Sequence, residues 1–156
     1  MTVKTTVEKK ADEQQQALLR VALRAAIAQA SDEQLEESRP RILAERLART
    51  RLDNAQIRNL ENLAYTTDKV SDITDLLKKQ IGRDGKAQRW ASDNVGQEVI
   101  AALEALRAGA DQIVKNLSEQ FRGVIDADLN RRVHLELCRE FVKHLAAEFM
   151  YRKRGA

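Results

Sequence analysis

The sequence predicts an all-α fold, a single-domain helical bundle of about five helices. Straight-chain helix formers (Ala, Leu, Glu, Gln, Lys and Arg) dominate, while proline occurs once and aromatic residues make up 4% of the chain. No segment alternates β-branched or aromatic residues with polar ones, so strands are not expected. A length of 156 residues suits one domain that buries a core without metal or disulfide help. We expect a flexible lead-in over residues 1–10 and the domain over 11–156.

The first predicted helix ends near Ala30. Its apolar side is rich in alanine and carries Leu19, Leu23, Ile27 and Ala30. Ser31 and Gln34 have the spacing of a capping box, which predicts that a new helical segment starts there. Pro40 suits the first turn of a following helix over residues 40–50, because that position needs no N–H donor.

The clearest predicted helix runs from Asp53 to Ile81. Asp53 is a good N-cap, with Gln56 at the third helical position. Spacings of three and four continue along the whole segment, through Ile57, Leu60, Ala64, Thr67, Val70, Thr74, Leu77 and Ile81. Gly82 is the expected C-cap, since glycine accepts a positive φ without steric cost.

Two more helices complete the predicted bundle. One begins near Lys86 or after Ser92 and reaches Phe121. Gly96 and Gly109 lie inside it, and one of them is expected to mark either a break or a close helix crossing. The last helix, over residues 127–151, has a broad apolar face and is expected to be central to the core.

The most informative functional feature is a basic cluster at residues 78–89. This segment holds five basic side chains and one acid, whereas the rest of the chain has 22 basic and 23 acidic residues. The cluster therefore carries a net charge of +4 and the rest of the chain −1, so this segment accounts for the whole net charge of +3. A compact positive patch attracts a phosphate backbone, although cations near a helix C-terminus also occur with no binding role.

Two further segments favour polyanion binding. Residues 55–59 place Gln56, Arg58 and Asn59 at the start of a helix, where free N–H groups bind phosphate. The plain alternative is that Asp53 only caps this helix. The tail at residues 151–154 adds three consecutive cations after Tyr151. Three positive elements together favour nucleic-acid binding more than any one alone.

Catalytic and metal chemistry is not expected. His134 and Cys138 share one helix face, but two ligands are too few for a zinc site, and His144 lies too far along the helix to join them. Gly82–Gly85 lacks the spacing of phosphate loops. We therefore expect no enzyme activity, no metal and no cofactor. One cysteine, no apolar leader and no membrane-length apolar run predict a cytoplasmic protein without membrane partners.

Two segments carry a family resemblance. Leu52–Leu60 (LDNAQIRNL) resembles the T-x-x-Q-I-R-x-h entry to a helix in the small subunit of type III CRISPR effector complexes. Phe141–Lys153 is similar to the amphipathic closing helix of that family, which ends in an aromatic and a basic residue. Together they cover 22 of 156 residues. Tyr65 falls later than the family's aromatic, and Ile81–Arg83 only partly matches its small–x–Gly–Arg stretch.

The resemblance implies a non-catalytic subunit in antiviral RNA-guided interference. It would stack with copies of itself and with other subunits of the ribonucleoprotein, touching the guide and target RNA backbone through basic side chains. The candidate phosphate contacts are Arg58, by motif position, and Lys78, Lys79, Arg83, Lys86 and Arg89, by clustering. Gln56 and Asn59 are candidate contacts to ribose or to a neighbouring subunit.

Two other functions remain open from the sequence. A helical adaptor or homodimerisation module would use the Ala-rich first helix or the wide last helix to bind a partner, with no nucleic-acid role. A small DNA-binding regulator is disfavoured, because no short helix–turn–helix pair stands out.

Overall fold

A computed structural model describes residues 5–154, and within that range it contains six α-helices and no strand. The all-α prediction is confirmed, with one helix more than expected. The helices are α1 (Thr6–Glu36), α2 (Arg39–Ala48), α3 (Asn54–Thr66), α4 (Val70–Asp84), α5 (Val95–Gln120) and α6 (Leu129–Arg154), with a 3₁₀ turn, η1 (Ser92–Asn94), before α5.

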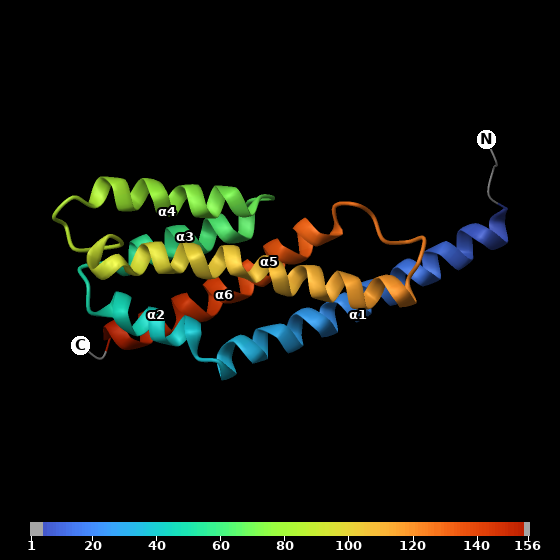
Figure 1. Ribbon diagram of the computed structural model, residues 1–156, viewed down its shortest axis with the longest axis horizontal. Coiled ribbons are helices and arrows are strands. Elements are labelled where there is room, and N and C mark those ends of the chain that lie inside the picture. Colours follow the sequence, from blue (N-terminus) through green and yellow to red (C-terminus); the bar gives the residue numbers. More distant parts are fainter. Residues whose placement is uncertain (1–4, 155–156) are drawn as a thin grey trace.

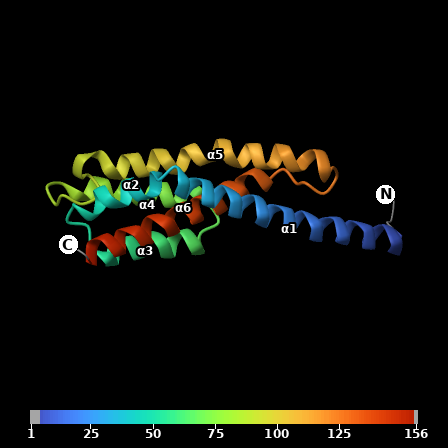
Figure 2. The same ribbon diagram turned by 90° about the horizontal axis from the view of Figure 1, so that it is seen from below.

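The molecule is elongated, and α5 and α6 run antiparallel along it (Figure 1). At one end α2, α3 and α4 pack around them, and at the other end α1 covers them alone. The N-terminal end of α1 extends past the turn between α5 and α6, as both views show (Figures 1 and 2). No helix within residues 5–154 has the length and apolar character needed to cross a membrane.

The start and end of α1 both differ from the prediction. The helix begins at Thr6, so residues 6–10 of the expected lead-in are helical, and residues 1–4 lie outside the described residues. Thr5 and Glu8 form a capping box, in which the Thr5 Oγ1 accepts the Glu8 N–H at 3.2 Å. Ser31 and Gln34 do not cap a new helix. They are buried inside α1 against α6, where the Ser31 Oγ lies 2.7 Å from His144 Nε2 and the Gln34 Nε2 donates to the Leu137 carbonyl at 3.5 Å.

The helix predicted over Asp53–Ile81 is two helices. Thr67 to Lys69 separate α3 from α4, and the Thr67 Oγ1 accepts the Lys69 N–H at 3.2 Å while donating to Asp72 Oδ2 at 2.5 Å. Arg139 of α6 donates to the carbonyls of Ala64 and Thr67, at 2.7 and 2.9 Å. These contacts complete the end of α3 and fold the pair into a hairpin.

Glycines shape the junction between α4 and α5. Gly82 is inside α4 and is not its C-cap, whereas Gly85 ends the helix with φ +50°. Gly96 marks a close approach, because a Cβ there would lie 2.5 Å from the Trp90 carbonyl oxygen. At Gly109 a Cβ would meet only a Leu137 methyl at 3.8 Å, so no close crossing occurs there.

The core has two parts of unequal size, and α6 contributes to both, which confirms its central position. The larger part lies among α2–α6 and includes Trp90, Phe141 and Phe149. The smaller part lies where α1 crosses α5 and α6, and its buried members are Ala110, Val114, Leu129, Val133 and Leu137.

Candidate nucleic-acid interface

The basic cluster sits at the C-terminal end of α4 and in the loop that leads to α5. Its one acid, Asp84, is buried, and the Asp84 Oδ2 accepts the Ala91 N–H at 2.7 Å. The Asp84 carbonyl also accepts the Ala87 N–H at 2.7 Å. Because the bond to the Ala91 N–H holds the carboxylate inward, the charges that the cluster exposes are all positive.

The loop between α4 and α5 is held in an unusual backbone conformation. Gln88, Asp93 and Asn94 have positive φ values of 58°, 52° and 58°, in addition to Gly85. Non-glycine residues in this region store strain that the surrounding structure must offset. The buried Trp90 and the hydrogen bond from the Ala91 N–H to the Asp84 Oδ2 provide that support. Lys86 and Arg89 therefore project from a fixed loop.

All five cations of the cluster, Lys78, Lys79, Arg83, Lys86 and Arg89, are exposed. Within residues 5–154 none of them forms an ion pair with a carboxylate. Lys79 and Arg83 lie one helical turn apart on the outer side of α4. The cluster therefore stays positively charged at its surface.

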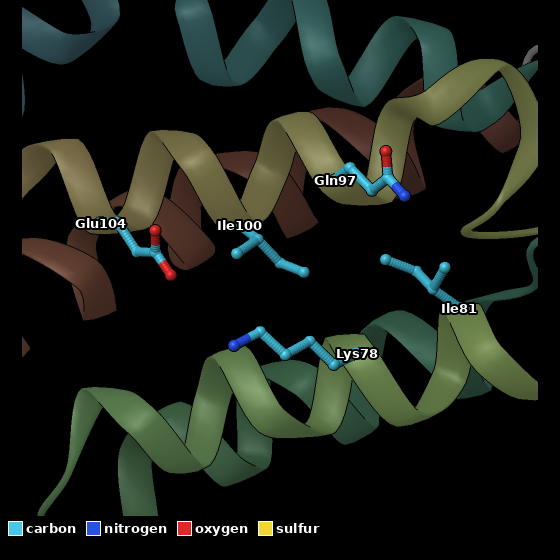
Figure 3. Close-up of a pocket in the computed structure, with 5 residues that line it drawn as sticks. All are labelled: Lys78, Ile81, Gln97, Ile100 and Glu104. Carbon is cyan, nitrogen blue, oxygen red and sulfur yellow. The ribbon is translucent and has the colours of Figure 1, made fainter.

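Lys78 departs from the outer side of α4. It points across a shallow groove of about 390 Å³ between α4 and α5, which Ile81, Gln97, Ile100 and Glu104 also line (Figure 3). The five cations are thus spread around the end of α4 and the loop. They form a rounded positive patch with Lys78 at its edge.

The start of α3 differs from the predicted phosphate site. The Asp53 carboxylate accepts the Gln56 N–H at 2.9 Å, and Gln56 Oε1 accepts the Asp53 N–H at 3.1 Å. This capping box was predicted, and it places a carboxylate where a phosphate would have bound the helix end. The side-chain oxygen of Gln56 is therefore engaged, while Arg58 and Asn59 are exposed on the helix surface.

The structure brings two more basic segments to the same end of the molecule. The Arg51 N–H donates to the Gln88 carbonyl at 2.8 Å, joining the α2–α3 connection to the cluster loop. From the end of α6, Lys153 Nζ donates to the carbonyl of Thr50 at 2.6 Å. Arg46 of α2 also holds the loop, with its guanidinium 2.9 Å from the Asp93 carbonyl oxygen.

We define the basic end as residues 45–58, 78–98 and 148–154. These segments hold twelve Lys and Arg against six Asp and Glu, whereas the rest of the chain holds 15 and 18. The basic end therefore carries more than the whole net positive charge of the protein. Sequence reasoning found the cluster and the tail but missed Arg46 and Arg51, because only the fold brings them beside the loop.

The histidines and the cysteine serve packing. His134 Nε2 and Cys138 Sγ both contact the Leu103 carbonyl oxygen, at 2.8 and 3.5 Å. Burial raises the pKa of the Cys138 thiol to about 12, which keeps it protonated and unreactive. His144 Nε2 lies 2.7 Å from the Ser31 Oγ. No group of three or more potential metal ligands occurs within residues 5–154.

Comparison with protein-family models, with curated proteins and with solved structures finds no match to this chain. The functional assignment therefore depends on the chemistry of the basic end and on the resemblance of the two short segments described above.

Proposed function

We propose that this protein is a non-catalytic RNA-binding subunit of a ribonucleoprotein, of the kind found as the small subunit of type III CRISPR effector complexes. In this role the basic end contacts the phosphate backbone of the guide and target RNA. Other surfaces contact neighbouring subunits. Arg58, Lys79, Arg83, Lys86 and Arg89 are the proposed phosphate contacts, with Lys78 at the edge of the patch.

The observation that carries the proposal is the set of five cluster cations that pair with no carboxylate among residues 5–154. Surface cations in folded proteins commonly pair with acids on the same helix, as Arg152 does with Glu148 at 2.8 Å. In the cluster, Asp84 is turned inward instead. Lys and Arg side chains without a carboxylate partner can neutralise phosphates. The counterions condensed on the nucleic acid are then released, which favours binding without regard to sequence.

The distribution of aromatic residues supports contact with the backbone over contact with bases. Trp90, Phe121, Phe141 and Phe149 are buried, and within residues 5–154 only Tyr65 and Tyr151 expose their rings. Binding of single strands through bases requires several exposed rings on which bases stack. A duplex held through its phosphates requires none.

The anchored loop also supports the proposal. Arg51, Asp84 and Arg46 fix the loop through bonds to Gln88, Ala91 and Asp93. A patch that is ordered before binding loses less conformational entropy when RNA arrives.

The test is recovery of the protein from cells that make it, at low salt, followed by analysis of the bound material. The proposal predicts guide-sized RNA together with several larger subunits. Replacing Lys79, Arg83 and Lys86 with alanine should reduce the RNA recovered at least about tenfold. Recovery of the protein without nucleic acid, or of equal RNA with the variant, would contradict the proposal.

A further inference from the structure

The outer side of α1 carries a heptad repeat that the bundle does not use. Seven positions recur at alternating spacings of four and three, the spacing of a coiled-coil seam, and six of them are apolar or small. The seven positions are Val7, Ala11, Gln14, Leu18, Val21, Ala25 and Ala28, and all seven are exposed. The exposed fractions of Val7, Val21 and Leu18 are 77%, 65% and 55%.

This seam is separate from the side of α1 that packs on the bundle. Leu19 is buried, and Leu23, Ile27 and Ala30 pack against the smaller core. A surface helix needs only one apolar stripe to dock on its own domain. The second stripe on α1 therefore has no role within a single copy of the chain.

The seam also lies partly on a segment that the bundle does not support. Residues 5–11 and 13–18 are exposed, and the N-terminal end of α1 extends beyond α5 and α6 (Figures 1 and 2). A helix of this length is marginal in water without packing. The Thr5–Glu8 capping box nevertheless specifies where the helix begins.

We propose that two copies of the protein pair through this seam as a parallel, two-fold coiled coil. The seam spans 22 residues, about 33 Å at the usual rise per residue. Five of the residues in it or beside it are alanines, which allows the two helices to approach closely: Ala11, Ala17, Ala22, Ala25 and Ala28.

The polar residues of the seam favour a second copy in parallel register. Gln14 would lie opposite Gln14 of the partner subunit, where the two amides can bond to each other. A single polar position in an otherwise apolar seam favours the register that pairs it with its own copy, as a buried Asn does in known coiled coils. Lys10 and Arg24, which flank the seam, would face Gln15 and Gln29 of the partner subunit. Neither cation would then oppose another cation.

This pairing does not depend on RNA binding, because the seam and the basic end lie at different places on the molecule. A parallel pair would direct its two basic ends to the same side. The inference and the proposed function can therefore fail separately.

The test is sedimentation equilibrium of the full chain after nuclease treatment, which removes any RNA that might bridge two copies. A dimer is expected, and Leu18→Glu with Val21→Glu should weaken the association at least about tenfold. Ile42→Glu is the matched control, since Ile42 is 53% exposed on α2, away from the seam, and should leave the dimer intact. The near-UV signal of buried Trp90 checks that each variant is folded.

Cysteine cross-linking tests the orientation. Gln14→Cys should form an interchain disulfide on mild oxidation, while the buried Cys138 should not react. A monomeric wild-type protein, or a dimer that the double glutamate variant does not weaken, would overturn the pairing. A dimer in which Gln14→Cys fails to cross-link would overturn the parallel register.

Discussion

The two ends of the molecule differ in how deeply they bury their helices and in the charge they expose. The basic end rests on a core of 22 buried residues, whereas the end covered by α1 has five. At the basic end, buried contacts hold a loop with unpaired cations in place. At the α1 end, apolar residues remain on the surface. The first arrangement suits a ligand that meets a rigid surface, and the second suits a partner that completes a helix interface.

The largest effect should come from opening a cavity in each core. Leu77→Ala removes a fully buried side chain from the larger core and should lower the free energy of unfolding by about 4–5 kcal/mol. Leu129→Ala, at the start of α6 in the smaller core, should cost only about 2 kcal/mol because its neighbours can relax. Urea denaturation measures both values. Equal losses would contradict the difference between the two cores.

Adding a methyl group at each of two glycines of α5, Gly96 and Gly109, should give the next largest difference in stability between the two ends of the molecule. Gly96→Ala places its Cβ against the Trp90 carbonyl and should cost about 2–3 kcal/mol of the free energy of unfolding. Gly109→Ala makes only an ordinary contact with a Leu137 methyl at 3.8 Å and should be neutral or stabilising by up to about 1 kcal/mol. Thermal denaturation distinguishes them, and a Gly96 variant as stable as wild type would rule out the close approach.

Because Asp84 supports the loop, replacing it should cause a smaller loss in the free energy of unfolding. Asp84→Ala leaves the Ala91 N–H without its partner and should cost about 1–2 kcal/mol. Asp84→Asn keeps an acceptor oxygen and is the matched control. Hydrogen exchange at the Ala91 amide should accelerate in the alanine variant only. If both variants exchange at the same rate, the carboxyl oxygen does not hold the loop.

The smallest effect is a pH dependence where α1 meets α6. Burial lowers the pKa of His144, with Lys143 also lowering it and Glu140 raising it. The unfolded chain therefore takes up a proton more readily, so stability is fully present above about pH 6.5 and declines as the pH falls below that. The slope of the melting temperature between pH 5.5 and pH 7.5 measures this effect. His144→Asn should flatten the slope, and an unchanged slope would assign it to other groups.

Local signals in the sequence predicted much of the fold. The Asp53–Gln56 capping box, Pro40 at the start of α2 and the central position of α6 were all predicted, because each depends on neighbouring residues or on a long apolar face. The break between α3 and α4 was not predicted. Apolar spacing continues through Thr67, and the contacts that end α3 come from Arg139 in a distant part of the chain.

The candidate interface was predictable only in part. Clustering along the sequence found the cations of residues 78–89, but it did not show that Asp84 turns inward. Nor did it show that Arg51 and Lys153 meet near the loop, since these contacts join segments far apart in the chain. The buried Ser31 and Gln34 misled the prediction for the same reason, because their partners lie on α6.

The most direct test of the basic end is the salt dependence of RNA binding by two matched variants. One replaces Lys79, Arg83 and Lys86 with alanine, and the other replaces Arg107, Lys115 and Arg122, which are exposed cations outside the basic end. Both remove the same charge. If the basic end binds phosphates, the first variant should reduce the slope of log K against log salt by about 2, and the second should leave it nearly unchanged. Equal changes in the two slopes would contradict the account.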